Sequence, residues 1–343
     1  MANIIVPPGW RLPESLATPE SVYWNRRRFI KGIGLGVAAV GLGACSQSSE
    51  GASSEGEEGV AVERPDHPLA TIPDTPTRDL YPADASDRFT LDRPLTDRIV
   101  AATHNNFYEF TTDKDAVWEH TGPFQARPWT VEITGEVDRG GVFDVADLER
   151  QIGLEERLYR FRCVEAWAMA VPWTGFAFHE LVRRVEPRST ARYVRFITFD
   201  RPDEAVGQRE QDWYEWPYYE GLRMDEAMNE LAFVATGIYG EPLPKQHGAP
   251  IRLVLPWKYG FKSPKSVVRI EFLQERPRTF WSDLRPDEYG FYSNVNPDVP
   301  HPRWSQSTEE MIGEDLERET LVHNGYGEWV ADLYDAEVMR GIT

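Results

Sequence analysis

The sequence predicts a β-rich α+β fold built as a single domain, with strands that dominate the middle of the chain. Two observations carry this prediction. Segments rich in β-branched residues alternate apolar and polar positions, as half-buried strands do; they are residues 129–137, 192–199, 251–257 and 266–273. Helical periodicity is limited to two short segments, 144–152 and 176–185. Long loops containing Pro and Gly join these segments, which is typical of a mixed sheet with few helices.

The elements follow one another in a readable order. The segment WTVEITGEV (129–137) ends at the turn residues DRGG, so a strand ends there. Residues 144–152 begin with Asp144, an aspartate in the position of a helix N-cap. In 176–185 the apolar residues Phe178, Leu181, Val182 and Val185 share one helix face. The strands predicted at 192–199, 251–257 and 266–273 are rich in Val and Ile.

The first 45 residues have the layout of an export signal. Arg26-Arg27-Arg28-Phe29-Ile30-Lys31 fits the twin-arginine pattern, and the apolar stretch that follows, 33–44, is too short to span a bilayer. Leu42-Gly43-Ala44-Cys45 resembles a lipobox. We therefore expect export of a folded protein to the periplasm and membrane contact only through a lipid on Cys45, with plain cleavage as the alternative.

Composition divides the rest of the chain and excludes one class of partner. The 343 residues carry 56 acidic and 37 basic side chains, a net charge of −19 that repels phosphate backbones, so nucleic acid is not expected. Residues 46–89 are rich in Ser, Gly, Glu and Pro and predict a solvated tether. Residues 90–343 are rich in aromatic residues without internal repeats, which predicts one compact domain.

Cys163 is the most chemically distinctive residue of the predicted domain. Once Cys45 is removed or acylated, it is the single thiol of the chain. Arg160 and Arg162 flank it, and cationic neighbours lower the pKa of a thiol. Its thiolate would be a nucleophile or a soft-metal ligand, and a buried packing role is the alternative. The common zinc, P-loop and serine-hydrolase motifs do not occur in the sequence.

Longer motifs make the sequence recognisable. They are RCVEAW (162–167), NNFYEF (105–110), GLRMDEAM (221–228), QHGAPIRLVLPWKYGFKSPKSV (246–267) and PDEYGFYSNVNPDVPHPRWSQ (286–306). From about residue 90 onward the chain resembles the catalytic subunits of the bacterial periplasmic protein-methionine-sulfoxide reductases. The resemblance implies the β-rich, barrel-like sulfite-oxidase fold, with one molybdenum-molybdopterin cofactor in each chain.

The resemblance also implies the residues of the site. Cys163 would be the catalytic residue and the protein ligand of molybdenum. The pterin-binding positions would be Asn105, Tyr108, Glu109, Thr198, His247, Arg252, Ser263, Pro264 and Lys265. Guanidinium and ammonium groups suit the phosphate of the pterin, and amides and carboxylates suit its ring edges. His247 stands where the family usually has asparagine, and an imidazole can replace only one amide contact at a time.

Each of these side chains also has an ordinary structural interpretation. Arg252 could serve a buried ion pair, and Lys258, Lys262 and Lys265 could form a solvated face. Tryptophans are more often core or interface residues than substrate contacts. With the resemblance we take the cofactor interpretation for the site residues, and we keep the packing interpretation for Trp167, Trp173, Trp257 and Trp304.

The resemblance implies a molybdenum-dependent reductase that returns protein-bound methionine sulfoxide to methionine by oxygen-atom transfer. Its substrates would be oxidised proteins of the cell envelope, and its electrons would come from a haem-containing membrane partner. The alternative with the same fold is a sulfite-oxidase-like enzyme for sulfite or another small substrate, which needs arginines clustered at the metal. The alternative of another class is a tethered domain that binds a ligand without catalysis.

Overall fold

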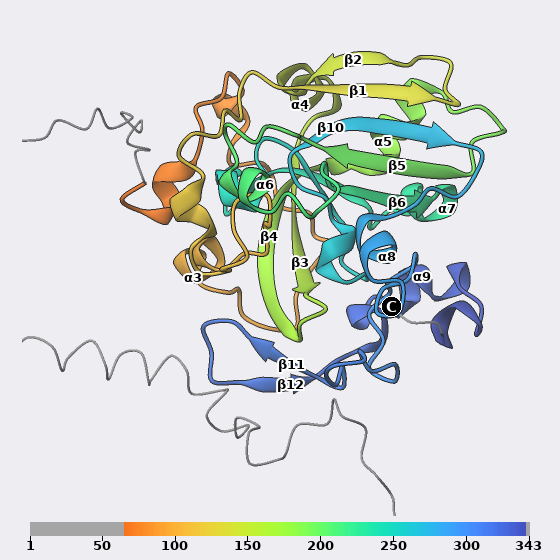
Figure 1. The fold of residues 1–343 in the computed structure, drawn as a ribbon. Helices are drawn as coiled ribbons and strands as arrows, with labels where there is room; N and C mark the ends of the chain where they lie inside the picture. Colours follow the sequence, from red (N-terminus) through yellow and green to blue (C-terminus); the bar gives the residue numbers. More distant parts are fainter. Residues whose placement is uncertain (1–64, 341–343) are drawn as a thin grey trace, which may run out of the picture. The chain divides into compact units, whose positions relative to one another are not determined.

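The computed structural model describes residues 65–340, and within them the predicted β-rich α+β class is confirmed (Figure 1). The first sheet has the strand order β2-β1-β10-β5-β6. Its strands are β1 (Thr130–Gly135), β2 (Gly141–Asp144), β5 (Tyr193–Thr198), β6 (Tyr219–Arg223) and β10 (Val267–Leu273). The pair β1–β10 is parallel and the other three pairs are antiparallel, so the sheet is mixed.

The second sheet has the order β12-β11-β4-β7-β8, with β3 beside β4 and β9 beside β7. Its strands are β3 (Glu155–Arg162), β4 (Trp167–Ala177), β7 (Phe233–Ile238), β8 (Glu241–Pro242), β9 (Arg252–Val254), β11 (Thr308–Met311) and β12 (Glu317–Glu319). In Figure 1 the long strands β3 and β4 run across the direction of the first sheet. Within residues 65–340 neither sheet closes on itself, so the barrel-like form expected from the sequence is replaced by two open mixed sheets.

The helices are short, and several single turns of 3-10 helix connect them. The α-helices are α3 (Arg98–Thr103), α4 (Val145–Ile152), α5 (Phe178–Val185), α6 (Val206–Glu210), α7 (Met224–Ala227), α8 (Phe280–Leu284) and α9 (Gly327–Val330). The 3-10 turns that concern the site are η5 (Lys245–His247) and η6 (Gly260–Lys262). No helix in the described part of the chain is both long and apolar enough to cross a membrane.

Local sequence explains the elements that were predicted. The side chain of Asp144 accepts hydrogen bonds from the backbone N–H groups of Ala146 and Asp147, so α4 begins where the cap predicts. In α5 the four apolar residues of the predicted face are all buried. The helix begins at Phe178, two residues later than expected, because Phe176 and Ala177 still belong to β4. The strand expected at 251–257 is only Arg252–Val254, since a turn follows and Pro256 cannot donate to a strand ladder.

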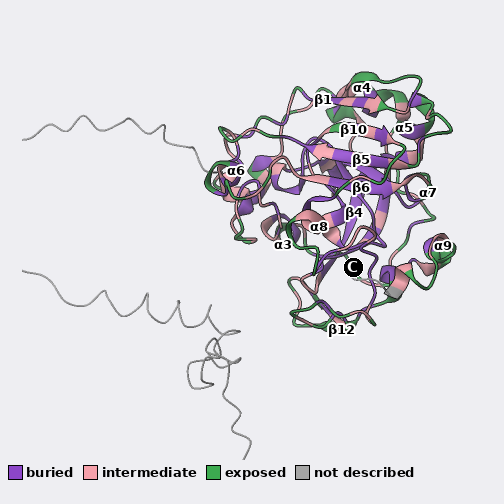
Figure 2. Cartoon of the chain, turned by 45° about the vertical axis from the view of Figure 1, so that its right-hand side comes forward, coloured by how far each residue is buried: buried purple, intermediate pink, exposed green. Residues whose placement is uncertain are grey.

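Strand β4 is the main element that periodicity missed. Its sequence WAMAVPWTGFA is buried from Ala168 to Ala177, because the strand lies between β3 and β7 with both faces covered. A strand buried on both faces has no alternation to detect. Figure 2 shows buried residues concentrated in the strands and exposed residues on α4 and the surface loops.

Part of the segment predicted as a tether is packed in the structure. Residues 65–89, which were assigned to it, are part of the packed body. Thr71 Oγ1 lies 2.6 Å from Gln246 Oε1, and Tyr81 Oη lies 2.7 Å from Thr236 Oγ1. The N–H of Ser86 donates to the carbonyl of Glu156 beside β3 (2.8 Å), and Phe89 is buried. The polar composition of this segment predicted a solvated tether, but polar groups in it form hydrogen bonds with the packed body instead. The expected signal and lipobox, residues 1–45, lie outside the described residues.

Gly175 provides a test of the β4–β7 pairing. A Cβ at this position would clash with the Val234 carbonyl and lie 2.8 Å from the Ala235 Cα, both of which are backbone atoms that cannot move independently. We expect Gly175→Ala to lower the free energy of unfolding by about 1–3 kcal/mol. Thermal and urea unfolding measure this. Gly327→Ala is the matched control, because a Cβ there meets nothing within 4 Å; equal stabilities of the two variants would contradict the pairing.

Candidate active site

The thiol of Cys163 lies in the tight turn that joins β3 to β4. The N–H of Cys163 donates to the Trp167 carbonyl (2.9 Å), and the N–H of Ala166 donates to the Cys163 carbonyl (3.1 Å). Ala166 has a φ of 68°, in the left-handed region that a side chain rarely adopts. The turn therefore has an uncommon backbone conformation, and such conformations are frequent at functional sites.

Three side chains from the C-terminal part of the chain, those of Trp304, Gln306 and Glu309, contact this turn or Arg162 beside it. The guanidinium of Arg162 is fully buried, donates to the Cys163 carbonyl and to Gln306 Oε1, and forms an ion pair with Glu309 (3.4 Å). Gln306 Nε2 and Trp304 Nε1 both donate to the Val164 carbonyl, at 2.7 and 2.8 Å. These contacts position the turn, so Arg162 has a supporting role and does not face the sulfur as a free cation.

Two side chains that the sequence did not assign to the site contact Cys163. Asn106 Nδ2 lies 3.4 Å from Cys163 Sγ and 2.9 Å from Glu165 Oε2, and the N–H of Glu165 lies 3.4 Å from the same sulfur. Lys114 forms an ion pair with Glu165 (3.1 Å). Asn106 follows the predicted residue Asn105 in the motif NNFYEF, and Glu165 belongs to RCVEAW. The two motifs therefore already contained both side chains.

The pKa of the Cys163 thiol is raised, whereas its basic neighbours in the sequence predicted that it would be lowered. Burial raises the pKa of Cys163 well above the usual range of a cysteine, and the nearby Glu165 carboxylate raises it further. Arg162 lowers the pKa, but by less than burial raises it. The free protein therefore holds a protonated thiol, which a bound metal cation would deprotonate.

The segment after α3, whose Asn106 contacts this sulfur, carries three predicted residues. Asn105 is buried and its amide donates to the Ala102 carbonyl (3.2 Å) at the end of α3. Tyr108 is half-buried, and burial raises the pKa of its hydroxyl, as do the neighbouring Glu165 and Cys163 to a lesser extent. Glu109 is buried and accepts a hydrogen bond from Thr198 Oγ1 (3.3 Å) at the end of β5. Burial also raises the pKa of Glu109.

A second group of predicted residues lies between η5 and β10. Arg252 is buried, and its guanidinium donates to the carbonyls of Leu253 (3.2 Å), His247 (3.1 Å) and Ser263 (3.3 Å). Ser263 is also buried, and its hydroxyl accepts from the Leu255 N–H. Buried Pro264 contributes its carbonyl to the Leu253 N–H (3.0 Å). The loop 263–265 is thus fixed along β9.

Lys265 connects the two groups. Its ammonium donates to the Asn106 carbonyl (2.7 Å), across 159 residues of sequence. Burial lowers the pKa of Lys265, the charge of Arg252 lowers it further, and the charges of Glu109 and Cys163 oppose this. Every predicted site residue therefore belongs to one of two groups that meet at Lys265.

These cations lack the partners that buried cations normally have. Within residues 65–340 neither Arg252 nor Lys265 forms an ion pair with a carboxylate, and the Nδ1 of buried His247 has no hydrogen-bond partner. By contrast, Lys258 and Lys262 are neutralised by Glu226 and Glu220, so they form neither a solvated face nor part of the site. Gly248 has a φ of 96°, and a Cβ there would lie 2.6 Å from Lys265 Cβ, which lets the chain pass closely. An anionic ligand with several acceptor oxygens fits this arrangement.

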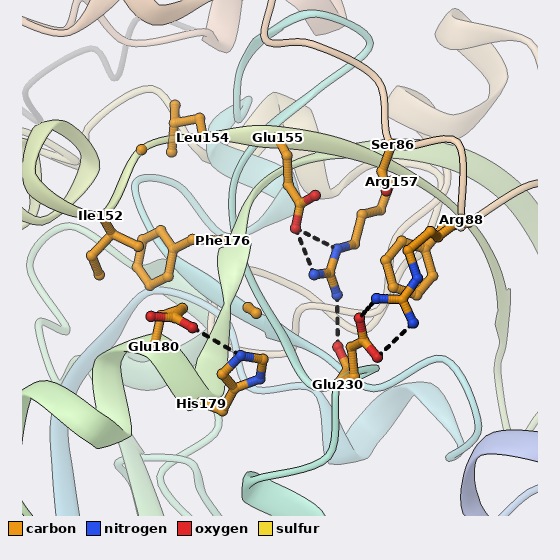
Figure 3. Close-up of a pocket in the computed structure, with 13 residues that line it drawn as sticks. Ser86, Arg88, Ile152, Leu154, Glu155, Arg157, Phe176, His179, Glu180 and Glu230 are labelled. Atoms are coloured by element: carbon orange, nitrogen blue, oxygen red, sulfur yellow. Dashed lines mark hydrogen bonds and ion pairs between the residues drawn. The ribbon is translucent and has the colours of Figure 1, made fainter.

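One surface cavity of the described chain lies elsewhere. It has a volume of about 390 Å³, and its lining includes Arg88, Arg157, Phe176, His179 and Glu230 (Figure 3). Both arginines in it are engaged: Arg88 with Glu230, and Arg157 with Glu155 and the Glu230 carbonyl. None of the predicted site residues lines it, so it is distinct from the Cys163 site.

Comparison with known proteins identifies the class to which this fold and site belong. The family described as "Oxidoreductase molybdopterin binding domain" matches residues 119–281. The chain is therefore a molybdopterin-binding oxidoreductase with a sulfite-oxidase-like fold, and molybdopterin is its cofactor. Among solved structures, the sulfane dehydrogenase SoxCD from Paracoccus pantotrophus aligns over 54% of this chain and 47% of that chain, with a TM-score of 0.40 and 18% identity.

Two relatives define the family more closely. The "Protein-methionine-sulfoxide reductase catalytic subunit MsrP" of Burkholderia mallei (strain ATCC 23344) is 44% identical over 94% of this chain and 93% of the relative. The protein of the same name from Xanthomonas axonopodis pv. citri (strain 306) is 43% identical over 94% of this chain and 95% of the relative. The chain belongs to the family of protein-methionine-sulfoxide reductase catalytic subunits.

His247 predicts a pH dependence for the cofactor-free protein. Burial lowers the pKa of His247 to about 3, and the charges of Arg252 and Lys265 act in the same direction. Between that value and about 6.5 the unfolded chain binds a proton that the folded chain does not, so stability falls as the pH falls through this window. Relative to His247→Gln, the unmodified chain should lose about 2 kcal/mol of unfolding free energy between pH 7 and pH 5.

Urea unfolding at the two pH values measures this difference. The control is His67→Asn, because the His67 ring is exposed and Asn can also accept the hydrogen bond of the Leu69 N–H. A stability difference between the chain and His247→Gln that does not change with pH would show that the ring is not held neutral.

Arg252 predicts a loss of bound cofactor. Replacing it with Gln keeps some hydrogen bonding but removes the buried positive charge, so an anionic group loses its strongest partner. We expect Arg252→Gln to retain no more than about one tenth of the parent's molybdopterin per folded chain, measured by the fluorescence of the oxidised pterin. Arg269→Gln is the control, because Arg269 is exposed and pairs with Glu132 on the outer face of the first sheet. Equal pterin content in both variants would exclude Arg252 from the site.

Proposed function

We propose that this protein is a molybdenum enzyme that reduces methionine sulfoxide in proteins, with Cys163 as the single protein ligand of the metal. One observation carries the proposal: the Cys163 thiol is buried in a rigid turn and is joined, through Asn106, to half-buried Lys265 and, beside it, buried Arg252, neither of which has a carboxylate partner in the described chain. The names of the two relatives support the substrate class.

The residues present suit the two ends of such a cofactor. Cys163 Sγ would hold the metal, and Asn106 Nδ2 is placed to donate to the resulting thiolate. Arg252 and Lys265 would neutralise the phosphate, while the loop 263–265 shapes the chain around it. The polar edges of the pterin would be met by the remaining predicted residues, which are Asn105, Tyr108, Glu109, Thr198 and His247. We propose one cofactor per chain.

The overall reaction consumes two electrons and two protons: the S–O bond of the sulfoxide breaks, a thioether forms, and the oxygen leaves as water. When bound, the molybdenum cofactor supplies a two-electron centre that can accept this oxygen. The chain's part is to hold the centre and to keep water from the sulfur ligand, since Cys163 is only 5% exposed. Asn106, Glu165 and Lys114 form a fixed polar surround next to that sulfur, which is preorganised for developing charge.

The cellular setting belongs to the same proposal. The twin-arginine motif and the lipobox support export to the periplasm and a lipid anchor at Cys45, with residues 46–64 as the tether to a catalytic domain that begins near residue 65. We propose a haem-containing membrane subunit as the electron donor and oxidised envelope proteins as substrates. The words "catalytic subunit" in the relatives' names support a separate electron-donating partner.

The sulfite alternative gains no support from the arginines. Arg160 is engaged by Asp92 and the Asn324 carbonyl, and Arg162 by Glu309 and Gln306. Arg252 is proposed to bind the phosphate of the cofactor, so it is not available to a substrate anion at Cys163. Within the described residues no cluster of free arginines faces Cys163, so the anion-binding surface that sulfite needs is missing.

Cys163→Ser tests the proposed ligand. Because a hydroxyl at this position is a far poorer ligand for a soft metal than a thiolate, reduction of methionine sulfoxide should fall at least about 100-fold. The assay follows oxidation of a reduced viologen dye, with free methionine sulfoxide and an oxidised protein as substrates. Molybdenum and pterin contents, expected near one per chain in the parent, show how much cofactor the variant holds.

A parallel assay with sulfite separates the two enzymatic alternatives. Full sulfoxide reductase activity in Cys163→Ser would refute the ligand assignment, and faster turnover of sulfite than of methionine sulfoxide would refute the proposed reaction. Absence of molybdenum from protein made in a molybdenum-replete host would favour the non-catalytic alternative.

A further inference from the structure

Aromatic side chains surround the outer side of the Cys163 turn. Tyr289 is buried in the same apolar cluster as Cys163, and Trp281 of α8 packs against that cluster. The rings of Trp281 and Tyr289 lie 5.3 Å apart. Tyr108, one of the predicted site residues, meets the edge of Trp281 at 5.7 Å. The site is thus walled by rings on the side of α8.

This wall continues to the surface through the loop between α6 and β6. Tyr214 lies 6.4 Å from Tyr108 and 6.3 Å from Trp281, measured between ring centroids. Trp213 lies 5.9 Å from Tyr214 and is 65% exposed. We call Tyr108, Trp213, Tyr214 and Trp281 the aromatic rim. It leads in two ring contacts from a residue beside the sulfur to an indole in solvent.

The loop that carries Trp213 is held firmly. Gln211 Nε2 donates to the Tyr108 carbonyl (2.8 Å), which ties the loop to the site segment, and Trp216 Nε1 donates to the Gln211 carbonyl (3.1 Å). Trp216 stacks on Phe280 of α8 at 5.6 Å, and the Tyr218 hydroxyl donates to the Phe261 carbonyl. A rigid support means that the exposed indole is presented in one place, which lowers the entropy cost of a contact.

The same loop is acidic. Glu210, Asp212 and Glu215 are exposed around Trp213, with Arg209 as the one basic residue of 209–215. Within residues 65–340 none of these three carboxylates forms an ion pair. An exposed indole flanked by unpaired carboxylates attracts a cationic side chain, through its ring face and through the neighbouring charges.

We propose that the aromatic rim, with Asp212 and Glu215, is the docking surface for the substrate: a polypeptide segment whose methionine sulfoxide is flanked by lysine or arginine. This inference rests on the proposed function and adds the substrate preference. Scattered exposed apolar residues are common on proteins. Trp213 differs from them because its ring contacts continue to the apolar cluster that contains Cys163, and because its surroundings carry charge complementary to a cationic segment.

Trp213, the exposed end of the rim, would act on the binding of peptides and not on the chemistry at the sulfur. Trp213 touches neither Cys163 nor a residue assigned to the cofactor, and it is reached only through Tyr214. A free sulfoxide, which has no flanking chain, cannot extend to Trp213 while its sulfur is at the metal. Loss of the indole should therefore raise the KM of peptides selectively.

The test compares three substrates with a reduced viologen dye as electron donor. They are N-acetylmethionine sulfoxide amide, a peptide with one methionine sulfoxide flanked by lysines, and the same peptide with glutamates in place of the lysines. The parent should show a KM at least about fivefold lower for the lysine peptide than for the glutamate peptide. Trp213→Ala should raise the KM of the lysine peptide about 5- to 20-fold, with kcat/KM for the small sulfoxide unchanged within about twofold.

Two variants separate the contributions of the ring and of the charges. Trp213→Phe should recover most of the peptide affinity, because a ring remains. The double variant Asp212→Asn/Glu215→Gln should abolish the preference for lysine over glutamate and the salt dependence of the lysine peptide's KM. Val142→Ala is the matched control, since Val142 is 68% exposed on β2, which is the edge of the first sheet opposite to β6 and the Trp213 loop.

The outcomes distinguish this inference from the proposed function. The docking surface is refuted, and the proposed function stands, if the parent reduces the small sulfoxide and Trp213→Ala leaves the KM of the lysine peptide unchanged. The same conclusion follows if Trp213→Ala lowers kcat/KM equally for the lysine peptide and for the small sulfoxide. A parent without preference between the two peptides refutes it as well. A cofactor-loaded parent that reduces none of the three substrates refutes the proposed function, and the inference fails with it.

Discussion

The constraint on which the site depends is a buried positive charge without a carboxylate partner. Burial lowers the pKa of Arg252 to about 9, and three backbone carbonyls together with the faces of Trp173 and Phe161 are its surroundings in the described chain. Taking a cation out of water without an opposite charge costs free energy, so other interactions in the fold must stabilise this arrangement. An anionic cofactor repays that cost, which couples its binding to the stability of the folded chain. The proposed export as a folded protein, with the cofactor loaded beforehand, agrees with this coupling.

The same constraint explains why distant segments converge. Lys265 lies beside Arg252 and reaches the Asn106 carbonyl, which brings the segment 105–110 to the loop after η6. Asn106 in turn contacts Cys163, 57 residues away in sequence. A chain of three polar contacts therefore fixes the distance between the cationic end of the site and the thiol. A cofactor that must be held at both ends requires such a fixed spacing, and partly buried contacts supply it better than mobile surface ones.

The sequence predicted the parts of this structure that depend on local pattern. Strands β1, β5 and β10 alternate, and α4 and α5 have a cap or an apolar face, so each was found within a few residues. Strand β4 has no alternation because both faces are buried, and the predicted barrel did not form because the sheets end at free edge strands. Residues 65–89 look like a tether because their composition is polar, but hydrogen bonds to residues such as Gln246 and Glu156 appear only in the folded chain. Motifs indicated the candidate site residues, whereas the direction in which Arg162 points and the contact of Asn106 with sulfur depend on tertiary packing that no local pattern encodes.

The raised pKa of Cys163 and its proposed role as a metal ligand agree with each other. A thiol that is 5% exposed and protonated reacts slowly with oxidants, because the thiolate is the reactive form and access is restricted. The environment that raises the pKa is therefore protective for a single cysteine until a metal arrives. A metal cation reverses the balance, since the low polarity that disfavours an isolated thiolate strengthens its attraction to a positive centre. One buried environment can thus keep the free sulfur inert and hold the bound sulfur firmly, and the contacts of Arg162, Gln306 and Trp304 with the turn keep the sulfur in place in both states.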